Sequence, residues 1–233
     1  MNIAVFGANG PTGQHLTKQA LAGGHLVTAF TRHPEIFPIR HERLRVMQGD
    51  VFDSSAVEQA IAGTDAVLST LGVPFSRKPI SVYSQGITHI AQAMSQHGVR
   101  RLVCVSSSAT DPHVDPKGGF IFERIVQPTI INTIGRTVYE DMRRMEKLVR
   151  ESNLDWTIVR PSGLFETPEV TKYQMAEVYI RGRYTSRADL ASCMLQQLTN
   201  DRYLRKIVAV ATTSIQPSML KLIVREAFQR RPN

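Results

Sequence analysis

Short, continuously apolar and β-branched segments alternate with helical patterns along almost the whole chain. Such segments are typical of strands buried on both faces of a parallel sheet, and their alternation with helices predicts a doubly wound α/β fold. We therefore predict a Rossmann-type doubly wound parallel sheet within one domain over residues 1–233, with a small C-terminal extension on the substrate side. The predicted strands are 2–6, 25–30, 43–48, 65–70, 101–107, 155–161 and 206–211, and the predicted helices are 12–22, 54–61, 81–97, 137–152, 187–198 and 217–228.

Three evenly spaced glycines follow the first predicted strand and open the first predicted helix. In dinucleotide-binding turns, glycines permit a tight bend, close approach of a pyrophosphate and close packing of helix on strand. The spacing here is G-x-x-G-x-x-G, and a tight turn without a ligand is the alternative. The position of the turn favours a phosphate-binding loop made of Gly7, Asn9, Gly10, Thr12 and Gly13.

The end of the second predicted strand indicates which cofactor this loop would hold. An acidic residue there would bind the ribose 2′-hydroxyl of NAD, but the strand ends in Thr31, Arg32 and His33. A guanidinium can form a forked, charge-assisted contact with a 2′-phosphate. Arg32 therefore predicts NADP(H) in preference to NAD(H), with a solvated surface arginine as the alternative.

Two further strand ends supply predicted cofactor contacts. Asp50 and Val51 follow the third strand, where a side chain next to the adenine is needed, and Asp53 is predicted either for this role or as the cap of the next helix. The fourth strand ends in Thr70, Leu71 and Gly72, which are expected to pass close to the ribose and the phosphates.

Charge and composition limit the classes of partner. The net charge of +8 and the isoelectric point near 9.8 suit a polyanionic partner, either a nucleic acid or a phosphorylated cofactor. The basic residues are scattered and form no aromatic–basic platform, which argues against nucleic acid. No apolar run is long enough to span a membrane, no signal peptide precedes the first strand, and no metal site is predicted.

The two cysteines and the assembly state complete these expectations. Cys104 and Cys193 lie in apolar contexts, which favours two buried free thiols over a disulfide and, with the absence of a leader, a cytoplasmic protein. A monomer and a small homo-oligomer both remain open.

Five motifs together resemble one family, the atypical short-chain dehydrogenases/reductases, in their NmrA-like and flavin reductase (biliverdin reductase B) branch. The motifs are GANGPTG, GDVFD, VSSSAT, ESNLDWTIVRPSGL and TSRADLASCMLQQL, and the resemblance covers residues 1–213. It implies NADPH bound across the C-terminal ends of the strands. It also implies that Pro161, Ser162 and Gly163 line the nicotinamide side, and that Arg187 and Asp189 are structural.

The usual catalytic residues of these enzymes are only partly present. Ser108 resembles the family serine after the fifth strand, with Ser106 and Ser107 as competitors for that role; Ser106 is predicted as a cofactor contact. The Tyr-x-x-x-Lys motif is absent. Tyr139 and Arg143 have its spacing, so Tyr139 is a candidate proton donor, but alignment on the VRPSG motif places the usual pair at residues 138 and 142.

The irregular segment 107–135 is predicted to cover the site. His113 is either a proton donor or a solvated histidine, and Phe120 and Phe122 either line an aromatic pocket or belong to the core or an oligomer contact.

Two functions from different classes follow from these observations. The first is an NADPH-dependent oxidoreductase that reduces a small planar acceptor such as a flavin or a quinone, because such acceptors need less precise acid catalysis than ketones. The second is a non-catalytic NADP(H)-binding redox sensor, which the missing Tyr/Lys pair also predicts. A sugar-nucleotide epimerase is disfavoured by the missing pair and the short C-terminal substrate lobe.

Overall fold

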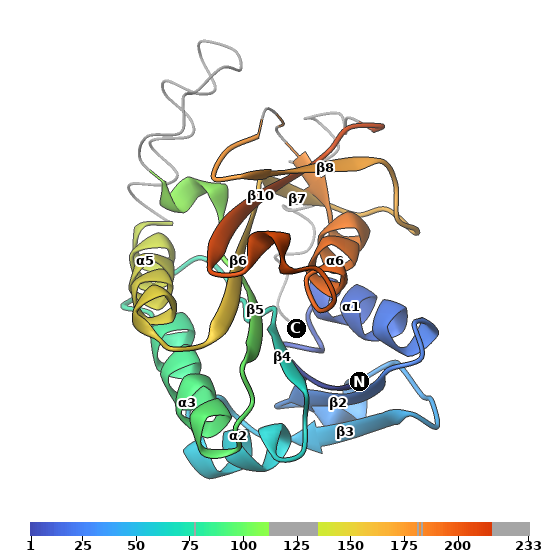
Figure 1. Cartoon of the computed structure of the whole chain (residues 1–233), viewed down its shortest axis with the longest axis vertical. Helices are drawn as coiled ribbons and strands as arrows, with labels where there is room; N and C mark the ends of the chain where they lie inside the picture. The colour runs from blue at the N-terminus through green and yellow to red at the C-terminus, as the bar shows by residue number, and fades with distance from the viewer. Residues whose placement is uncertain (77, 112–134, 181, 183, 216–233) are drawn as a thin grey trace.

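The computed structural model, which describes residues 1–76, 78–111, 135–180, 182 and 184–215, contains an eight-stranded sheet (Figure 1). The strand order is β3-β2-β1-β4-β5-β6-β10-β8, and β7 and β9 form a separate parallel pair. The strands are β1 (Asn2–Phe6), β2 (Leu26–Thr31), β3 (Leu44–Gln48), β4 (Ala66–Ser69), β5 (Arg101–Val105), β6 (Asp155–Pro161), β7 (Gly163–Phe165), β8 (Tyr173–Glu177), β9 (Tyr184–Ser186) and β10 (Lys206–Thr212).

Helices cover both faces of this sheet (Figure 1). The helices α1 (Pro11–Ala22) and α6 (Arg187–Gln196) lie on one face. The other face carries α2 (Ser54–Ile61), α3 (Val82–Gln96) and α5 (Arg136–Glu151). Three 3₁₀ turns complete the described elements, at Pro34–Ile36, Ser108–Thr110 and Asp201–Tyr203.

Side-chain alternation along the strands divides the interior into two cores. In β1, Ile3 and Val5 pack towards α1 and α6, whereas Ala4 and Phe6 pack towards α2, α3 and α5, and all four are fully buried. Both faces of the central strands are therefore apolar, which explains their continuous hydrophobic pattern.

The direction in which the sheet is built reverses between β1 and β4. Val5 pairs in parallel with Ala29 of β2 on one side and with Leu68 of β4 on the other. Because the connections leave these two strands in opposite directions, their carboxyl ends form the switch point at which doubly wound folds bind ligands.

The doubly wound fold is confirmed, and the predicted strands and described helices agree with the structure to within about two residues at most ends. The sequence analysis missed β7, β8 and β9. β8 runs antiparallel to β10, with Val208 opposite Glu177, so the sheet is not wholly parallel. Its residues are only partly buried because it is an edge strand, which leaves a weak hydrophobic signal. The predicted helix 217–228 lies outside the described residues, as do His113, Phe120 and Phe122.

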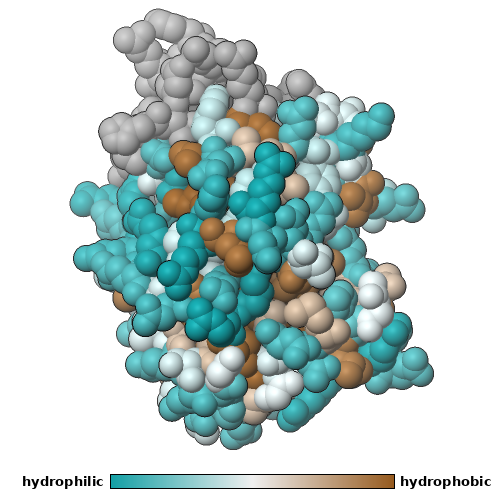
Figure 2. Space-filling view, in the orientation of Figure 1, coloured by the Kyte–Doolittle hydropathy of each residue, from teal (hydrophilic) through white to brown (hydrophobic). Residues whose placement is uncertain are grey.

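The surface and the cysteines fit a conventional packed domain. On the face drawn in Figure 2, hydrophilic residues predominate and apolar residues form small separate groups. Cys104 and Cys193 are buried free thiols, as predicted, and burial raises the pKa of Cys193 to about 12. Among the described helices, none has the length and apolar content needed to cross a membrane.

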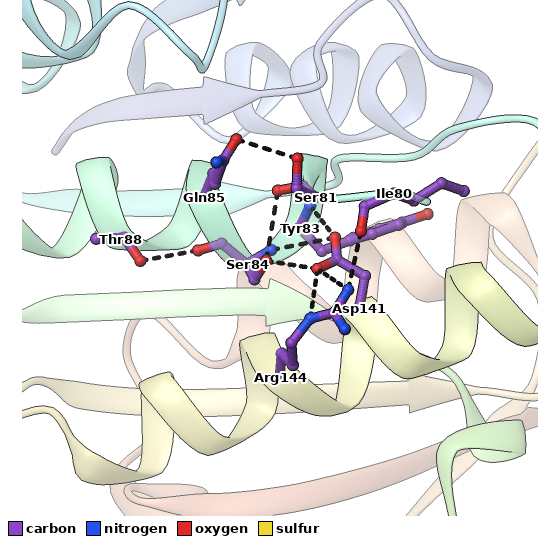
Figure 3. A network of polar contacts seen from close by, with 8 residues as sticks. All are labelled: Ile80, Ser81, Tyr83, Ser84, Gln85, Thr88, Asp141 and Arg144. Atoms are coloured by element: carbon purple, nitrogen blue, oxygen red, sulfur yellow. Dashed lines mark hydrogen bonds and ion pairs between the residues drawn. The ribbon is translucent and has the colours of Figure 1, made fainter. Parts of the chain in front are cut away.

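A buried carboxylate on α5 caps the neighbouring helix α3 (Figure 3). Asp141, which is fully buried, accepts hydrogen bonds from the backbone N–H groups of Tyr83 and Ser84 at 2.9 and 3.3 Å. Arg144 donates to the same carboxylate and to the carbonyl oxygen of Ile80. A residue distant in sequence thus satisfies N–H groups of the first turn of α3, which the Ser81 side chain does not cap.

We expect Asp141→Asn to lower the free energy of unfolding by about 1–3 kcal/mol, the usual cost of a lost charged acceptor for buried donors. Denaturant unfolding would measure the change. The control is Asp155→Asn, which removes a carboxylate from the exposed pair with Arg100 and should change stability much less. Equal effects of the two substitutions would contradict the capping role.

Candidate cofactor site

The turn between β1 and α1 depends on two of its three glycines. Gly7 has a φ of +75°, and a side chain there would also lie 2.6 Å from the carbonyl oxygen of Thr70. A side chain at Gly13 would collide with the carbonyl oxygen of Gly7. Gly10 is less constrained, and its N–H donates to Gly7 O at 3.1 Å. The glycines therefore bring the start of α1 directly against the end of β1.

The N-terminus of α1 carries no side-chain acceptor. Pro11 occupies the first helical position, Gly10 supplies no capping group, and the first turn contains no acidic residue. Free N–H groups and the helix dipole favour an anion at such an end. This end of the helix fits a phosphate group, because the predicted loop residues leave its donors available.

The carboxyl ends of β2 and β3 lie at the same edge of the sheet as this loop because both strands run parallel to β1. Arg32 is exposed directly after β2, as a contact to a 2′-phosphate requires. The Asp50 carboxylate accepts the N–H of Phe52 at 3.1 Å, whereas Asp53 accepts those of Ser55 and Ala56 at 3.0 and 3.1 Å. Asp53 is therefore the helix cap, which leaves Asp50 as the candidate for the adenine.

Val51 and the residues after β4 are held together by α3. Gly86 of α3 packs against both Val51 and Leu71, where a side chain would meet Leu71 Cδ1 at 2.9 Å. His89 Nδ1 lies 2.8 Å from Val51 O, so this ring nitrogen carries the proton and donates it. Because Gly86 has no side chain, the predicted cofactor contacts Val51 and Leu71 can both pack closely against α3.

The segment after β4 is fixed at both ends. The Thr70 hydroxyl donates to the carbonyl oxygens of Phe6 and Gly7 at 3.1 and 3.2 Å. The Tyr83 hydroxyl accepts the N–H of Val73 at 3.3 Å, and burial raises the pKa of Tyr83 to about 12. Gly72, between these anchors, is exposed at the site. Tyr83 was not predicted, and its place on an apolar helix face gave no signal that distinguished it from a core residue.

The three serines after β5 have different environments. Ser106 is 3% exposed, and its hydroxyl has no hydrogen-bond partner among the described residues. Its N–H donates to Val159 O, which fixes it at the end of the strand. The Ser107 hydroxyl accepts the N–H of Ala109. Ser108 is partly buried and begins the 3₁₀ turn. A buried hydroxyl without a partner suits a polar ligand group.

Helix α5 brings Tyr139 to the same end of the sheet but not in the usual arrangement. Val138 is buried and Met142 packs against the same core, so the two positions of the family pair hold apolar residues. The ring of Tyr139 lies 6.1 Å from that of Phe75, which follows β4. Arg143 Nε donates to Thr110 O at 2.9 Å, so this arginine supports the turn after β5.

A buried ionic cluster, which the sequence analysis missed, lies under this turn. Arg160 donates to Glu146 through Nη2 and Nε at 2.7 and 2.9 Å and to Asp111 at 2.9 Å. Burial opposes the charge of Arg160, but its contacts with Glu146 and Asp111 raise its pKa above the usual value. The Thr110 hydroxyl also donates to Glu146. The sequence signal that could have revealed this cluster is Arg160 itself, a charged residue within the predicted apolar strand 155–161.

The residues after β6 are only partly available to a ligand. The N–H of Ser162 donates to the Thr185 hydroxyl at 3.1 Å, and the Ser162 hydroxyl lies 3.0 Å from the same oxygen. Pro161 is buried and Gly163 is exposed. Ser162 therefore joins β6 to β9, and Gly163 is the exposed part of this predicted group.

Together, the carboxyl ends of β1, β2, β4 and β5 place the phosphate loop, Arg32, the Thr70–Gly72 segment and Ser106 along one edge of the sheet. This set fits a dinucleotide, with donors for phosphates at α1 and a cation at β2. Within the described part of the chain, no group of three His, Cys, Asp or Glu side chains is arranged to hold a metal.

Comparison with known proteins agrees with this geometry. The sequence profile of a family described as NAD(P)H-binding matches residues 7–201. An uncharacterised chloroplastic protein of Arabidopsis thaliana is 24% identical over 92% of this chain and 78% of its own length. The (4-alkanoyl-5-oxo-2,5-dihydrofuran-3-yl)methyl phosphate reductase of Streptomyces griseus is 29% identical over 68% of this chain and 46% of its own length.

The fold also matches solved structures. A short-chain dehydrogenase/reductase of Veillonella parvula, solved in complex with NADP, superposes with a TM-score of 0.77 at 21% identity, over 94% of this chain and 99% of the other.

Proposed function

This chain belongs to the NAD(P)H-binding family, and from that premise we propose that it is an NADPH-dependent reductase whose acceptor is a small planar molecule such as a flavin or a quinone. The observation that carries the proposal is the uncapped N-terminus of α1 behind the glycine turn, with Arg32 exposed on the neighbouring strand. The named reductase among the relatives and the NADP-bound structural neighbour support it.

Each residue of the site has a proposed role in holding the cofactor. The α1 end binds the pyrophosphate, Arg32 binds the 2′-phosphate, and Asp50 and Val51 contact the adenine side. The Ser106 hydroxyl donates to or accepts from the ribose or the nicotinamide amide. When bound, the reduced nicotinamide supplies hydride to the acceptor.

The proposed acceptor class follows from what α5 lacks. Val138 and Met142 occupy the positions of the usual Tyr/Lys pair, so no lysine lowers the pKa of a tyrosine there. A flavin or quinone tolerates this arrangement because its reduced form can take a proton from solvent. We propose that Ser108 orients the acceptor and that Tyr139 serves as the proton donor.

We expect the purified protein to oxidise NADPH faster than NADH when FMN or a small quinone is the acceptor, measured as loss of absorbance at the nicotinamide band. Gly13→Val is the matched control, because its side chain would collide with Gly7 O and disrupt the phosphate loop. Tight NADPH binding without turnover on any acceptor would contradict the reductase and favour the NADP(H)-binding sensor.

A further inference from the structure

An arginine, a carboxylate and a histidine gather at the first turn of α1, outside the glycine loop. Arg187, the first residue of α6, lies with Nη1 3.4 Å from the Thr12 hydroxyl. Its Nε lies 2.6 Å from Glu166 Oε1, and Glu166 Oε2 lies 3.2 Å from His15 Nε2. Arg187 and Glu166 are each about one-quarter exposed. The cluster thus connects α6, the segment after β7 and α1.

Arg187 lies at a helix end where an anion rather than a cation is favoured. The N-terminus of a helix carries partial positive charge, and cations are favoured at the opposite end. The first turn of α1 contains no acidic residue and no side-chain cap, so Arg187 adds a full positive charge to an already positive site. The single carboxylate of Glu166 pairs with Arg187 and also contacts His15, so the partial positive charge of the helix end itself has no acidic residue of the first turn to balance it.

Asp189, two positions after Arg187 in α6, has a different environment from Arg187. The Asp189 carboxylate accepts the N–H and hydroxyl of Thr171 at 2.6 and 2.8 Å and the hydroxyl of Thr212. Asp189 is fully buried, so its contacts are those of a structural residue. The Ser186 hydroxyl caps α6 by accepting the N–H of Asp189. Arg187 takes no part in this cap, because a guanidinium has no acceptor, and its side chain reaches α1 instead.

We propose that Arg187 binds the pyrophosphate of the cofactor together with the N-terminus of α1, and that Glu166 holds the guanidinium in place for this contact. The inference rests on the proposed cofactor site and extends it to a residue to which the family resemblance assigns a structural role. A guanidinium carries five N–H donors in a planar fork, so Arg187 can bind a phosphate oxygen while Nε remains on Glu166.

Binding of NADPH and of NADH to an Arg187→Met variant tests the proposal. We expect both dissociation constants to rise by about 10- to 100-fold, because both cofactors carry the pyrophosphate. Titration calorimetry or nicotinamide fluorescence would measure this. The control is Arg100→Met, which removes an arginine from a carboxylate pair at the opposite edge of the sheet and should leave both constants unchanged.

Further measurements separate phosphate binding from a structural role. Arg187→Lys should recover part of the affinity, and the salt dependence of binding should be weaker in Arg187→Met than in the unmodified protein. If the methionine variant does not fold, Arg187→Gln takes its place with the same expected loss.

Unchanged affinity, or a loss confined to NADPH, would overturn the proposal, as would a fall in the unfolding temperature of the ligand-free variant with affinity preserved. These outcomes concern Arg187 alone. If the unmodified protein bound neither cofactor, the proposed function would fail together with this inference.

Discussion

Arg32→Asp is expected to weaken NADPH binding by about 100-fold or more and NADH binding by only a few-fold. Arg32 is exposed directly after β2, and no ion pair within the described residues holds it elsewhere. The substitution removes a charge-assisted contact to the 2′-phosphate and places a carboxylate beside that phosphate. NADH has a hydroxyl at this position, and this hydroxyl can donate a hydrogen bond to the introduced carboxylate.

The ratio of the two dissociation constants is the measurement that decides this prediction. Arg45→Asp is the matched control, because it makes the same change of charge at an exposed position on the neighbouring strand β3. That control should weaken the binding of both cofactors slightly and to the same extent, because it lowers the positive electrostatic potential of the whole protein. Equal losses for NADPH and NADH in Arg32→Asp would remove the 2′-phosphate assignment and with it the expected preference for NADP(H).

Arg160→Met is expected to lower the free energy of unfolding by about 3–5 kcal/mol, the range found when one partner of a buried ion pair is removed. Glu146 is 2% exposed and would lose the two hydrogen bonds that Arg160 donates to it. The methionine has a similar length, so the loss comes from the charge rather than from a cavity.

This substitution should also disturb the candidate site. Asp111 and Thr110 anchor the turn after β5 on the same cluster, and Ser108 begins that turn. Turnover should therefore fall even at temperatures where the variant remains folded. Denaturant unfolding and the steady-state rate are the two measurements. Arg100→Met, which breaks an exposed pair, should alter neither substantially. A stability similar to that of this control would show that the buried cluster contributes little.

The periodic parts of the fold were predictable from the chain. Strands such as 2–6 are apolar because both faces are covered, and helices such as 54–61 carry their own cap at Asp53. In contrast, β7 and β9 are three residues each and carry too few positions for a pattern. The edge strand β8 pairs antiparallel to β10 through contacts distant in sequence, which local preferences do not encode.

The candidate site shows the same division. The glycine turn was predictable because its glycines serve local geometry: Gly7 adopts a positive φ and Gly13 packs against Gly7. Of the three serines, only the structure distinguishes Ser106, whose buried hydroxyl has no partner among the described residues, from Ser107, whose hydroxyl caps the following turn. They are adjacent in one run of serines, so their burial and hydrogen bonds in the folded chain are what separate them.

The sequence by itself determined the alternation of strands and helices, the glycine turn after β1 and the presence of a cation after β2, because each depends on residues adjacent in the chain. Only the tertiary structure decided that Asp141 caps α3, that Arg160 is neutralised by Glu146, and that Arg187 lies at the start of α1. These contacts join residues between 14 and 175 positions apart. Which charges meet there depends on how the helices pack on the sheet, and no local pattern records that packing.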